Sequence, residues 1–499
     1  MKPEVGSINL LSITRSRAKM YEYDVPRESF INLPKDPKEL LMLTIGILGD
    51  FSASSSEDSR NESRLNMLFA AQYFDAYISS RLNQTLDNYL LLLGSAAYYL
   101  CDLPGSSFVL INNLDYTSGD IGSEDLEYLL ISVLRKDFDN MPTLDGNYKS
   151  EIERINTACK EFLLNGTSQN EITKLIDVLR DGIYYEGSDR QLLLIDTIRN
   201  VIIKFFSNSS WSNLPIYSGI DSSQWEEIIK KPSFIKELWP AQILLGEKNV
   251  YNGMSAIIQM PTSAGKTKSI EIIIRSSFLS SRANVAVIVA PFKALCNEIK
   301  GTLQEAFVNE RVRIDVPSDA FQIDFDIFSE IELETEKLIL ILTPEKFIYM
   351  MRHAPEIIDE VGLLVYDEGH QFDNGIRGVT YELLLSSLRL LIPKSTQIIL
   401  ISAVIMNADS IGNWLIGDNK TLVNGANLLP TYRTIGFVSW RDNLGRLEFV
   451  NPEIPDIDEF YVPRVISTVS LAKLGRERNA RIFPIKKDGK SIAIFLGLK

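Results

Sequence analysis

The stretch IIQMPTSAGKTKSIEIIIR, residues 257–275, indicates how this chain folds and where its chemistry lies. It predicts a short apolar strand over 255–260, a turn of small residues over 261–265, and an amphipathic helix from Lys266 onward. That order brings backbone N–H groups to a helix N-terminus, which is a natural cradle for phosphate oxygens. Lys266 can then reach the outer phosphates of a nucleotide, and the Thr267 hydroxyl can ligate Mg²⁺. Met260 stands where the general P-loop pattern has its first glycine, so the rest of the chain has to support this interpretation.

The composition is that of an ordinary globular protein. The 499 residues are enough for about three domains, and 45% of them are hydrophobic and 23% charged. Three cysteines without CxxC spacing argue against a disulfide framework or a zinc site and favour a reducing cytosol. The N-terminus lacks the apolar core of a signal peptide, and the longest apolar run, 89–100, is too short to cross a bilayer. We therefore expect a cytoplasmic protein without a membrane partner.

The net charge of −14 is unfavourable for a protein that binds nucleic acid. Bulk charge governs solubility and long-range steering, however, and a local basic channel can still bind phosphates. The charge alone therefore does not exclude a nucleic-acid ligand.

Residues 1–206 are predicted to form a helical N-terminal domain. Apolar residues recur at three- and four-residue spacing, for example in 126–134 and 152–164. No catalytic constellation occurs here, so we interpret the region as a scaffold or partner-docking domain. The polar stretch SNSSWSNLPIYSGIDSS, residues 207–223, contains Gly and Pro and is expected to be a linker.

Five short apolar strands are predicted after the linker, at 255–260, 285–290, 337–342, 361–366 and 396–401. Each runs into a polar or small-residue cluster: PTSAGKT, PFKAL, TPEKF, DEGHQ and SAVI. Strands of this kind are typical of a parallel sheet with helices on both faces. In such a sheet, ligands bind beyond the carboxyl ends of the strands. The sequence thus predicts an α/β domain over 224–435 with one ligand-binding edge.

An acidic pair follows the fourth of these strands. Asp367 is placed to anchor Mg²⁺, and Glu368 can polarise an attacking water as general base. The alternative is an acidic helix N-cap, where carboxylates are also favoured. His370 lies in the same loop; by itself it is more often a structural hydrogen-bonding residue, but beside the acidic pair we interpret it as coupling the nucleotide site to the next lobe.

The runs MPTSAGKT, APFKALCNEI, LTPEKF, VYDEGHQF and ISAVIMNADSIGNWL resemble motifs I, Ia, Ib, II and III of superfamily 2 helicases, in order and in spacing. DEGH is similar to the DExH group, and Arg377-Gly378 followed by YELL resembles the superkiller-like branch, as does NADSIGNWL. The resemblance covers residues 232–433. It implies a first RecA-like lobe of the P-loop NTPase class that hydrolyses ATP with Mg²⁺ and binds single-stranded or partly duplex nucleic acid.

The resemblance also implies roles for single residues around the nucleotide. Gln242 would recognise adenine, and Ser402 with Ala403 would couple hydrolysis to movement along the strand. The phosphates and Mg²⁺ would lie on the loop Pro261, Thr262, Ser263, Ala264, Gly265, Lys266 and Thr267.

A second group of residues would grip the sugar-phosphate backbone, which gives affinity without reading the base sequence. By the same resemblance this group is Pro291, Lys293, Thr343 and Arg377.

Two departures from the family pattern stand out. Val404 replaces the threonine of motif III, so coupling could differ. No QxxGRxGR motif occurs, and Arg476, Arg478 and Arg481 form the only arginine cluster near the end of the chain. We expect 436–499 to be a connector and the start of a second RecA-like lobe, with a last strand at 491–495, and the chain to be a fragment of a longer helicase. An arginine finger contributes roughly 10³–10⁵ in rate, so these residues alone should hydrolyse ATP poorly.

Three functions remain open from the sequence. The helical domain, the acidic charge and the absence of zinc elements resemble the Hachiman-type helicase of bacterial anti-phage defence, which works with a nuclease partner. This favours an ATP-dependent DNA helicase or translocase. The alternatives are an RNA helicase of decay or processing and a nucleotide-gated clamp that binds nucleic acid without unwinding it.

Overall fold

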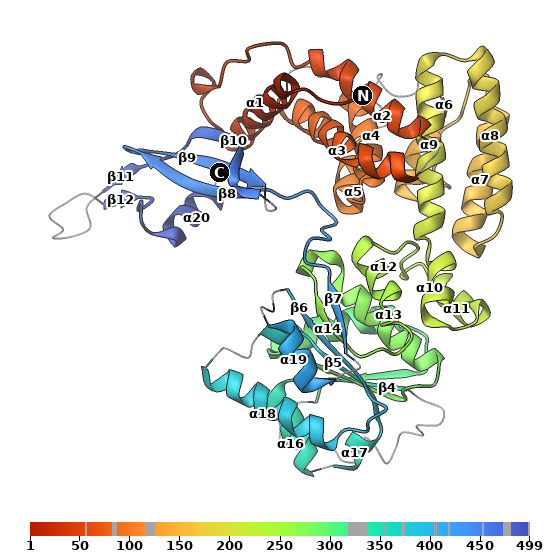
Figure 1. Ribbon diagram of the computed structural model, residues 1–499, viewed down its shortest axis with the longest axis vertical. Coiled ribbons are helices and arrows are strands. Elements are labelled where there is room, and N and C mark those ends of the chain that lie inside the picture. The colour runs from red at the N-terminus through yellow and green to blue at the C-terminus, as the bar shows by residue number, and fades with distance from the viewer. Residues whose placement is uncertain are drawn as a thin grey trace. The chain divides into compact units, whose positions relative to one another are not determined.

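The computed structural model describes residues 1–54, 57–81, 87–115, 125–317, 337–353, 355–370, 375–403, 405, 407–417, 420–451, 454–472 and 481–497 (Figure 1). The chain divides into two compact units. One consists of Met1–Lys160, Ser168–Lys204 and Thr431–Lys499, and the other of Glu161–Thr167 and Phe205–Pro430.

The second unit contains a seven-stranded sheet in the order β3-β4-β2-β5-β6-β1-β7, in which every neighbouring pair is parallel. This confirms the predicted α/β fold and all five predicted strands. Two short strands at the sheet edges, β3 and β7, were not predicted, because each has only one buried residue and so lacks the apolar run of the other strands. The strands are β1 (Ala256–Gln259), β2 (Val285–Val289), β3 (Val312–Asp315), β4 (Lys337–Leu342), β5 (Val361–Tyr366), β6 (Gln397–Ser402) and β7 (Thr421–Asn424).

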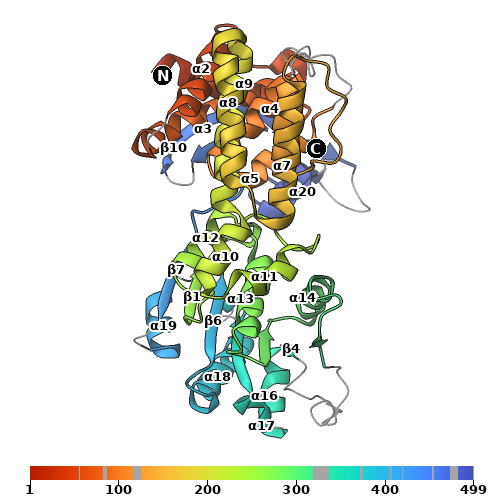
Figure 2. The ribbon, with the colours of Figure 1, turned by 90° about the vertical axis from the view of Figure 1, so that its right-hand side faces the viewer.

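Helices cover both faces of this sheet, as Figure 2 shows. Successive residues of a strand point to opposite faces, so Ala286 and Ile288 pack on one side and Val287 and Val289 on the other. The first side carries α11 (Ser222–Ile229), α12 (Pro240–Glu247), α13 (Lys266–Leu279) and α14 (Lys293–Ala306). The second carries α16 (Pro344–His353), α17 (Glu356–Asp359), α18 (Gly375–Leu391) and α19 (Ala408–Leu415).

The linker expected at 207–223 is instead mostly helical. Residues of this stretch form α10 (Ser210–Ser218) and the beginning of α11. Ser209 and Asp221 act as N-caps, because their side chains accept hydrogen bonds from the N–H groups of Trp211 and Ser223. The serines and the aspartate that looked like linker residues are therefore the start signals of two short helices.

The first unit is helical over most of its described length, in agreement with the periodicity of residues 1–206. Its helices are α1 (Val5–Glu22), the 3₁₀ turn η1 (Arg27–Ser29), α2 (Glu39–Ala53), α3 (Glu57–Ser79), α4 (Asp87–Leu100), α5 (Pro104–Asn112), α6 (Asp125–Arg135), α7 (Lys149–Asn165), α8 (Gln169–Glu186) and α9 (Asp189–Asn208). The last residues of α7 and α9 belong to the other unit.

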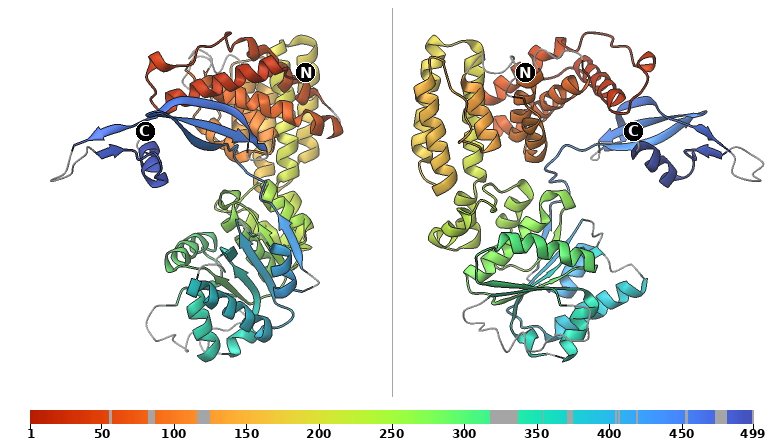
Figure 3. Two further views of the ribbon diagram at one scale, coloured as in Figure 1. Left: turned by 60° about the vertical axis from the view of Figure 1, so that its left-hand side comes forward. Right: turned by 180° about the vertical axis from the view of Figure 1, so that it is seen from behind.

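The same unit contains the C-terminal residues, which do not begin a second parallel lobe as expected. They form an antiparallel sheet, β10-β9-β8, beside α1 (Figure 3). Met20 of α1 is fully buried in a cluster with Phe449, Phe460 and Val462. The remaining elements are β8 (Ile435–Arg441), β9 (Leu444–Asn451), β10 (Ile454–Ser467), β11 (Val469–Leu471), β12 (Arg481–Phe483) and α20 (Gly489–Gly497).

Two details of the chain end follow from this arrangement. The strand expected at 491–495 is wrong, because these residues lie within the helix α20. Arg476 and Arg478 lie outside the described residues, whereas Arg481 opens β12. Across the described ranges, no helix is long and apolar enough to span a membrane.

Candidate nucleotide-binding site

The strand order brings three of the predicted clusters to neighbouring positions at one edge of the sheet. Strand β6 lies between β5 and β1, with Leu400 opposite Tyr366 and Ser402 opposite Gln259. The small-residue turn after β1, the acidic pair after β5 and Ser402 at the end of β6 therefore share one edge. This is the geometry that the five strand-end clusters predicted.

The turn after β1 has the backbone shape of a phosphate cradle. A 3₁₀ turn, η2 (Thr262–Ala264), leads into Gly265, whose φ of +85° is in the left-handed region, and α13 starts at the next residue. The left-handed φ favours glycine at this position, and a Cβ there would also lie 2.9 Å from the side-chain amide nitrogen of Gln242. Gln242 itself is buried, and its side-chain oxygen accepts a hydrogen bond from the N–H of Trp239 at 2.9 Å. The residue expected to contact adenine thus lies against the phosphate loop.

Lys266 and Glu368 meet across the sheet edge. Lys266 Nζ lies 3.2 Å from Glu368 Oε1, and the lysine side chain is only 6% exposed. The other carboxylate oxygen of Glu368 is 3.2 Å from His370 Nδ1, and the same imidazole nitrogen is 3.1 Å from Ser402 Oγ. A continuous chain of polar contacts therefore links the phosphate loop, the acidic turn and the end of β6.

Asp367 is buried at the end of β5. Burial raises the pKa of its carboxyl group, the charge of Glu368 raises that pKa further, and Lys266 opposes the shift. The N–H of Glu368 donates to Asp367 Oδ1 at 2.9 Å. The negative charge of such a buried carboxylate is poorly solvated. A divalent cation beside it would supply positive charge. Asp367 and Thr267, in the first turn of α13, fit the pair of residues expected to hold Mg²⁺.

Three of the four residues expected to grip nucleic acid, Pro291, Lys293 and Thr343, follow strands β2 and β4. These two strands are neighbours and lie on the side of β5 away from β6. Pro291 and Thr343 are buried, and the Thr343 carbonyl accepts a hydrogen bond from Phe347 N–H in α16. Lys293 is exposed at the start of α14. Of these three residues, only Lys293 therefore has an exposed side chain.

Some predicted residues receive no structural description. The side chain of Arg377, in α18, and all of Val404 lie outside the described residues. Ala403 follows Ser402 directly at the end of β6. A contact that the sequence did not predict is that of Tyr381, whose hydroxyl donates to the carbonyl of Asp367 at 3.1 Å. No local pattern could have revealed it, because the two residues belong to different elements.

Residues 245–411 match the DEAD/DEAH box helicase family. The chain carries a DEAD/DEAH box helicase domain. The chain is also 24% identical over 514 residues to the Hachiman protein HamB of Bacillus cereus, a match that covers 96% of this chain and 44% of HamB. These findings confirm both resemblances inferred from the sequence.

Further relatives of the helicase domain are the ATP-dependent DNA helicases Hel308 of Thermococcus kodakarensis and Pyrococcus abyssi. Each is 31% identical, and the matches cover 51% and 44% of this chain and 21% and 29% of the relatives. The structure of Mycobacterium smegmatis helicase Lhr bound to ssDNA and AMP-PNP matches with 22% identity and a TM-score of 0.32, over 37% of this chain and 25% of that one. The chain spans less than half the length of these relatives.

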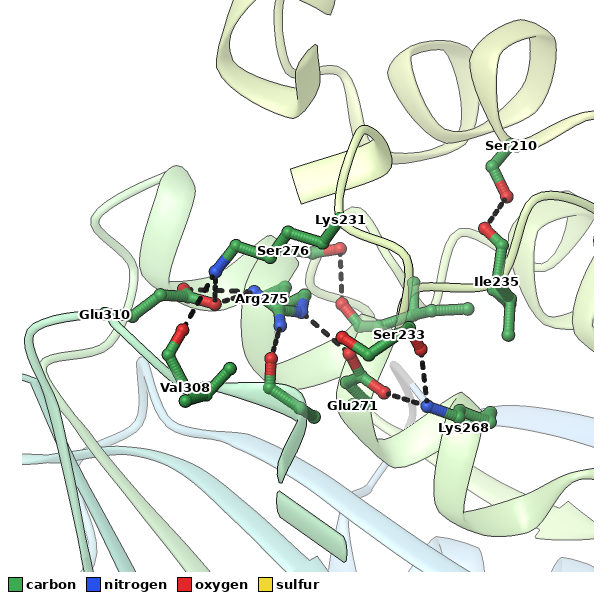
Figure 4. Close-up of polar contacts among 12 residues, drawn as sticks. Ser210, Lys231, Ser233, Ile235, Lys268, Glu271, Arg275, Ser276, Val308 and Glu310 are labelled. Atoms are coloured by element: carbon green, nitrogen blue, oxygen red, sulfur yellow. Dashed lines mark hydrogen bonds and ion pairs between the residues drawn. The ribbon is translucent and has the colours of Figure 1, made fainter. Parts of the chain in front are cut away.

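A buried ionic network holds the helix α13 in place (Figure 4). Arg275 of α13 is 1% exposed and bonds Glu271 at 3.0 Å, Glu310 at 2.9 Å and the carbonyl of Ala306 at 2.7 Å. Its guanidinium also lies over the ring of Phe307, 4.1 Å from the ring centroid. Because α13 begins with Lys266, this network fixes the helix whose N-terminus forms the phosphate cradle.

Replacing Arg275 with methionine should destabilise the protein by about 3 kcal/mol, because Glu271 loses a partner in a site where charge is poorly solvated. Urea denaturation monitored by circular dichroism measures this. The control is Lys230→Met, which breaks a half-exposed pair with Glu226 and should change stability by no more than about 0.5 kcal/mol. Equal losses in both variants would contradict the role given to the network.

Proposed function

We propose that this protein is an ATP-dependent nucleic-acid helicase or translocase that acts on DNA. The proposal rests on the ion pair between Lys266 and Glu368. This pair lies at the edge of the sheet where Asp367 and Thr267 are also found. Lysine and threonine at a helix N-terminus can hold the phosphates and Mg²⁺, while a carboxylate beside them can polarise a water aligned with the outermost phosphate. Hydrolysis of ATP is the reaction that this set of groups supports.

In the proposed mechanism, Mg²⁺ held by Thr267 and Asp367 would neutralise charge on the phosphates. Incoming phosphates would draw Lys266 away from Glu368, since both the carboxylate and the phosphate compete for the same ammonium group. Glu368 would then be available to orient water and accept its proton. His370, between Glu368 and Ser402, is placed to pass a change at the nucleotide to the end of β6.

DNA is favoured over RNA by similarity to the DNA helicases of the Hel308 type. The match to HamB, which extends over 96% of this chain and hence over the helical unit as well, supports a role in anti-phage defence. A nuclease partner is part of the same proposal and rests on the Hachiman-type resemblance of the sequence. The three free cysteines, all buried, agree with a cytoplasmic location. Failure of the full protein to capture a nuclease in a pull-down from its host cells would count against the partner.

Glu368→Gln should retain ATP binding and lose turnover by about 10²–10⁴-fold, because the general base is removed while the phosphate-binding groups remain. Lys266→Ala should weaken ATP binding by roughly 10- to 100-fold, because a charged hydrogen bond to phosphate is lost. Titration with a fluorescent ATP analogue and steady-state ATPase assays measure the two effects.

The matched control for these variants is Lys268→Ala. Lys268 lies on the same helix, but its amine bonds Glu271 and the carbonyl of Ser233 instead of the acidic turn. ATP affinity should therefore stay near that of the parent. Parent-like turnover in Glu368→Gln would refute the site assignment.

Single-stranded DNA should stimulate ATP hydrolysis more than single-stranded RNA of the same length, and added salt should reduce the stimulation steeply because the grip is on phosphates. ATPase assays over a range of salt concentrations test this. Stronger stimulation by RNA would indicate an RNA helicase of decay or processing. Stimulation without any strand displacement by the protein would indicate a nucleotide-gated clamp.

A further inference from the structure

The peptide between Asp367 and Glu368 is held by hydrogen bonds on both sides. Asp367 N–H donates to the carbonyl of Val289 at 2.9 Å, which is the last bond between β5 and β2. Glu368 N–H donates to the Asp367 carboxylate at 2.9 Å. The Asp367 carbonyl accepts from the Tyr381 hydroxyl at 3.1 Å. The carbonyl side of this peptide is therefore held by a side chain from α18.

The backbone of Glu368 needs such support. Its φ is +53°, in the left-handed region that residues with a Cβ seldom adopt. The next residue, Gly369, has no room for a side chain, since a Cβ there would lie 2.5 Å from Leu400. Strained backbone of this kind persists only where the surroundings fix it. Rotation of the 367–368 peptide would relieve φ at Glu368 and carry its carboxylate away from Lys266.

Tyr381 is suited to prevent this rotation. It is 1% exposed, and its hydroxyl donates to the Asp367 carbonyl from the neighbouring helix α18. Without it, the buried Asp367 carbonyl would be short of a hydrogen bond, which favours reorientation of the peptide.

We propose that Tyr381 is a positioning residue, whose hydroxyl fixes the Asp367–Glu368 peptide and thereby keeps Glu368 directed at the phosphate loop. The proposal rests on the ATPase function proposed above. Tyr381 acts through Glu368 and does not touch the nucleotide.

The structure offers a matched control in Tyr366, the last residue of β5. Its ring is also buried, in the same hydrophobic cluster, with its centroid 6.4 Å from that of Tyr381. The Tyr366 hydroxyl is buried and makes no hydrogen bond within the described part of the chain. Tyr366→Phe and Tyr381→Phe thus remove the same atom from the same environment, but only the second removes a hydrogen bond to the acidic turn.

The test compares the full-length parent with Tyr381→Phe and Tyr366→Phe. Tyr381→Phe should lower kcat for ATP by roughly tenfold while the affinity for ATP stays unchanged, since one buried hydrogen bond is lost. Hydrogen exchange followed by mass spectrometry should show faster exchange in the segment 363–370. Tyr366→Phe should match the parent in kcat and in exchange.

Equal exchange at 363–370 in the two variants would overturn the proposal, and so would equal kcat. A fall of kcat in Tyr381→Phe that is matched by a fall in ATP affinity would also overturn it, because that result indicates general loss of structure. The exchange measurement does not depend on turnover, so it decides the role of Tyr381 even if the protein is no ATPase. Failure of the proposed function itself would appear separately, as equal turnover in the parent and Glu368→Gln.

Discussion

The contact between Lys266 and Glu368 is the interaction around which the helicase domain is arranged. It joins the start of α13 to the turn after β5, across the end of an intervening strand. Two opposite charges at this partly buried edge of the sheet attract each other and tie the two segments together. In the proposed mechanism a triphosphate would separate the same two charges, so the packing of this edge and its chemistry depend on one pair.

Other charged side chains of this domain are also withdrawn from water, and contacts with one another compensate their charges. Arg275, Glu271 and Glu310 fix the far side of α13, and Asp367 lies buried with its pKa raised by burial. Charge that is withdrawn from water has to be compensated by neighbours. For the Arg275 network the neighbours are protein side chains, whereas for Asp367 burial and the charge of Glu368 raise the pKa although Lys266 opposes the shift.

In the first unit, segments from the two ends of the described chain pack against each other. α1 packs on the sheet β8–β10, where Arg15 bonds Glu459 at 2.6 Å and Ser16 donates to the carbonyl of Tyr461. This sheet completes the hydrophobic cover of α1. The chain after the helicase domain therefore packs against the N-terminal helix α1.

The sequence by itself determined the parallel sheet, its five main strands and the residues at their carboxyl ends, because apolar runs and small-residue turns are local patterns that backbone geometry converts directly into strands and loops. It misassigned the 207–223 segment, since the same serines and aspartate are typical of linkers and of helix N-caps. Only the tertiary structure decided that β6 lies between β5 and β1, that Glu368 adopts a positive φ, that Tyr381 bonds the acidic turn and that the C-terminal sheet covers α1. These features depend on contacts between residues far apart in the chain, and such contacts leave no periodic signal in the residues that make them.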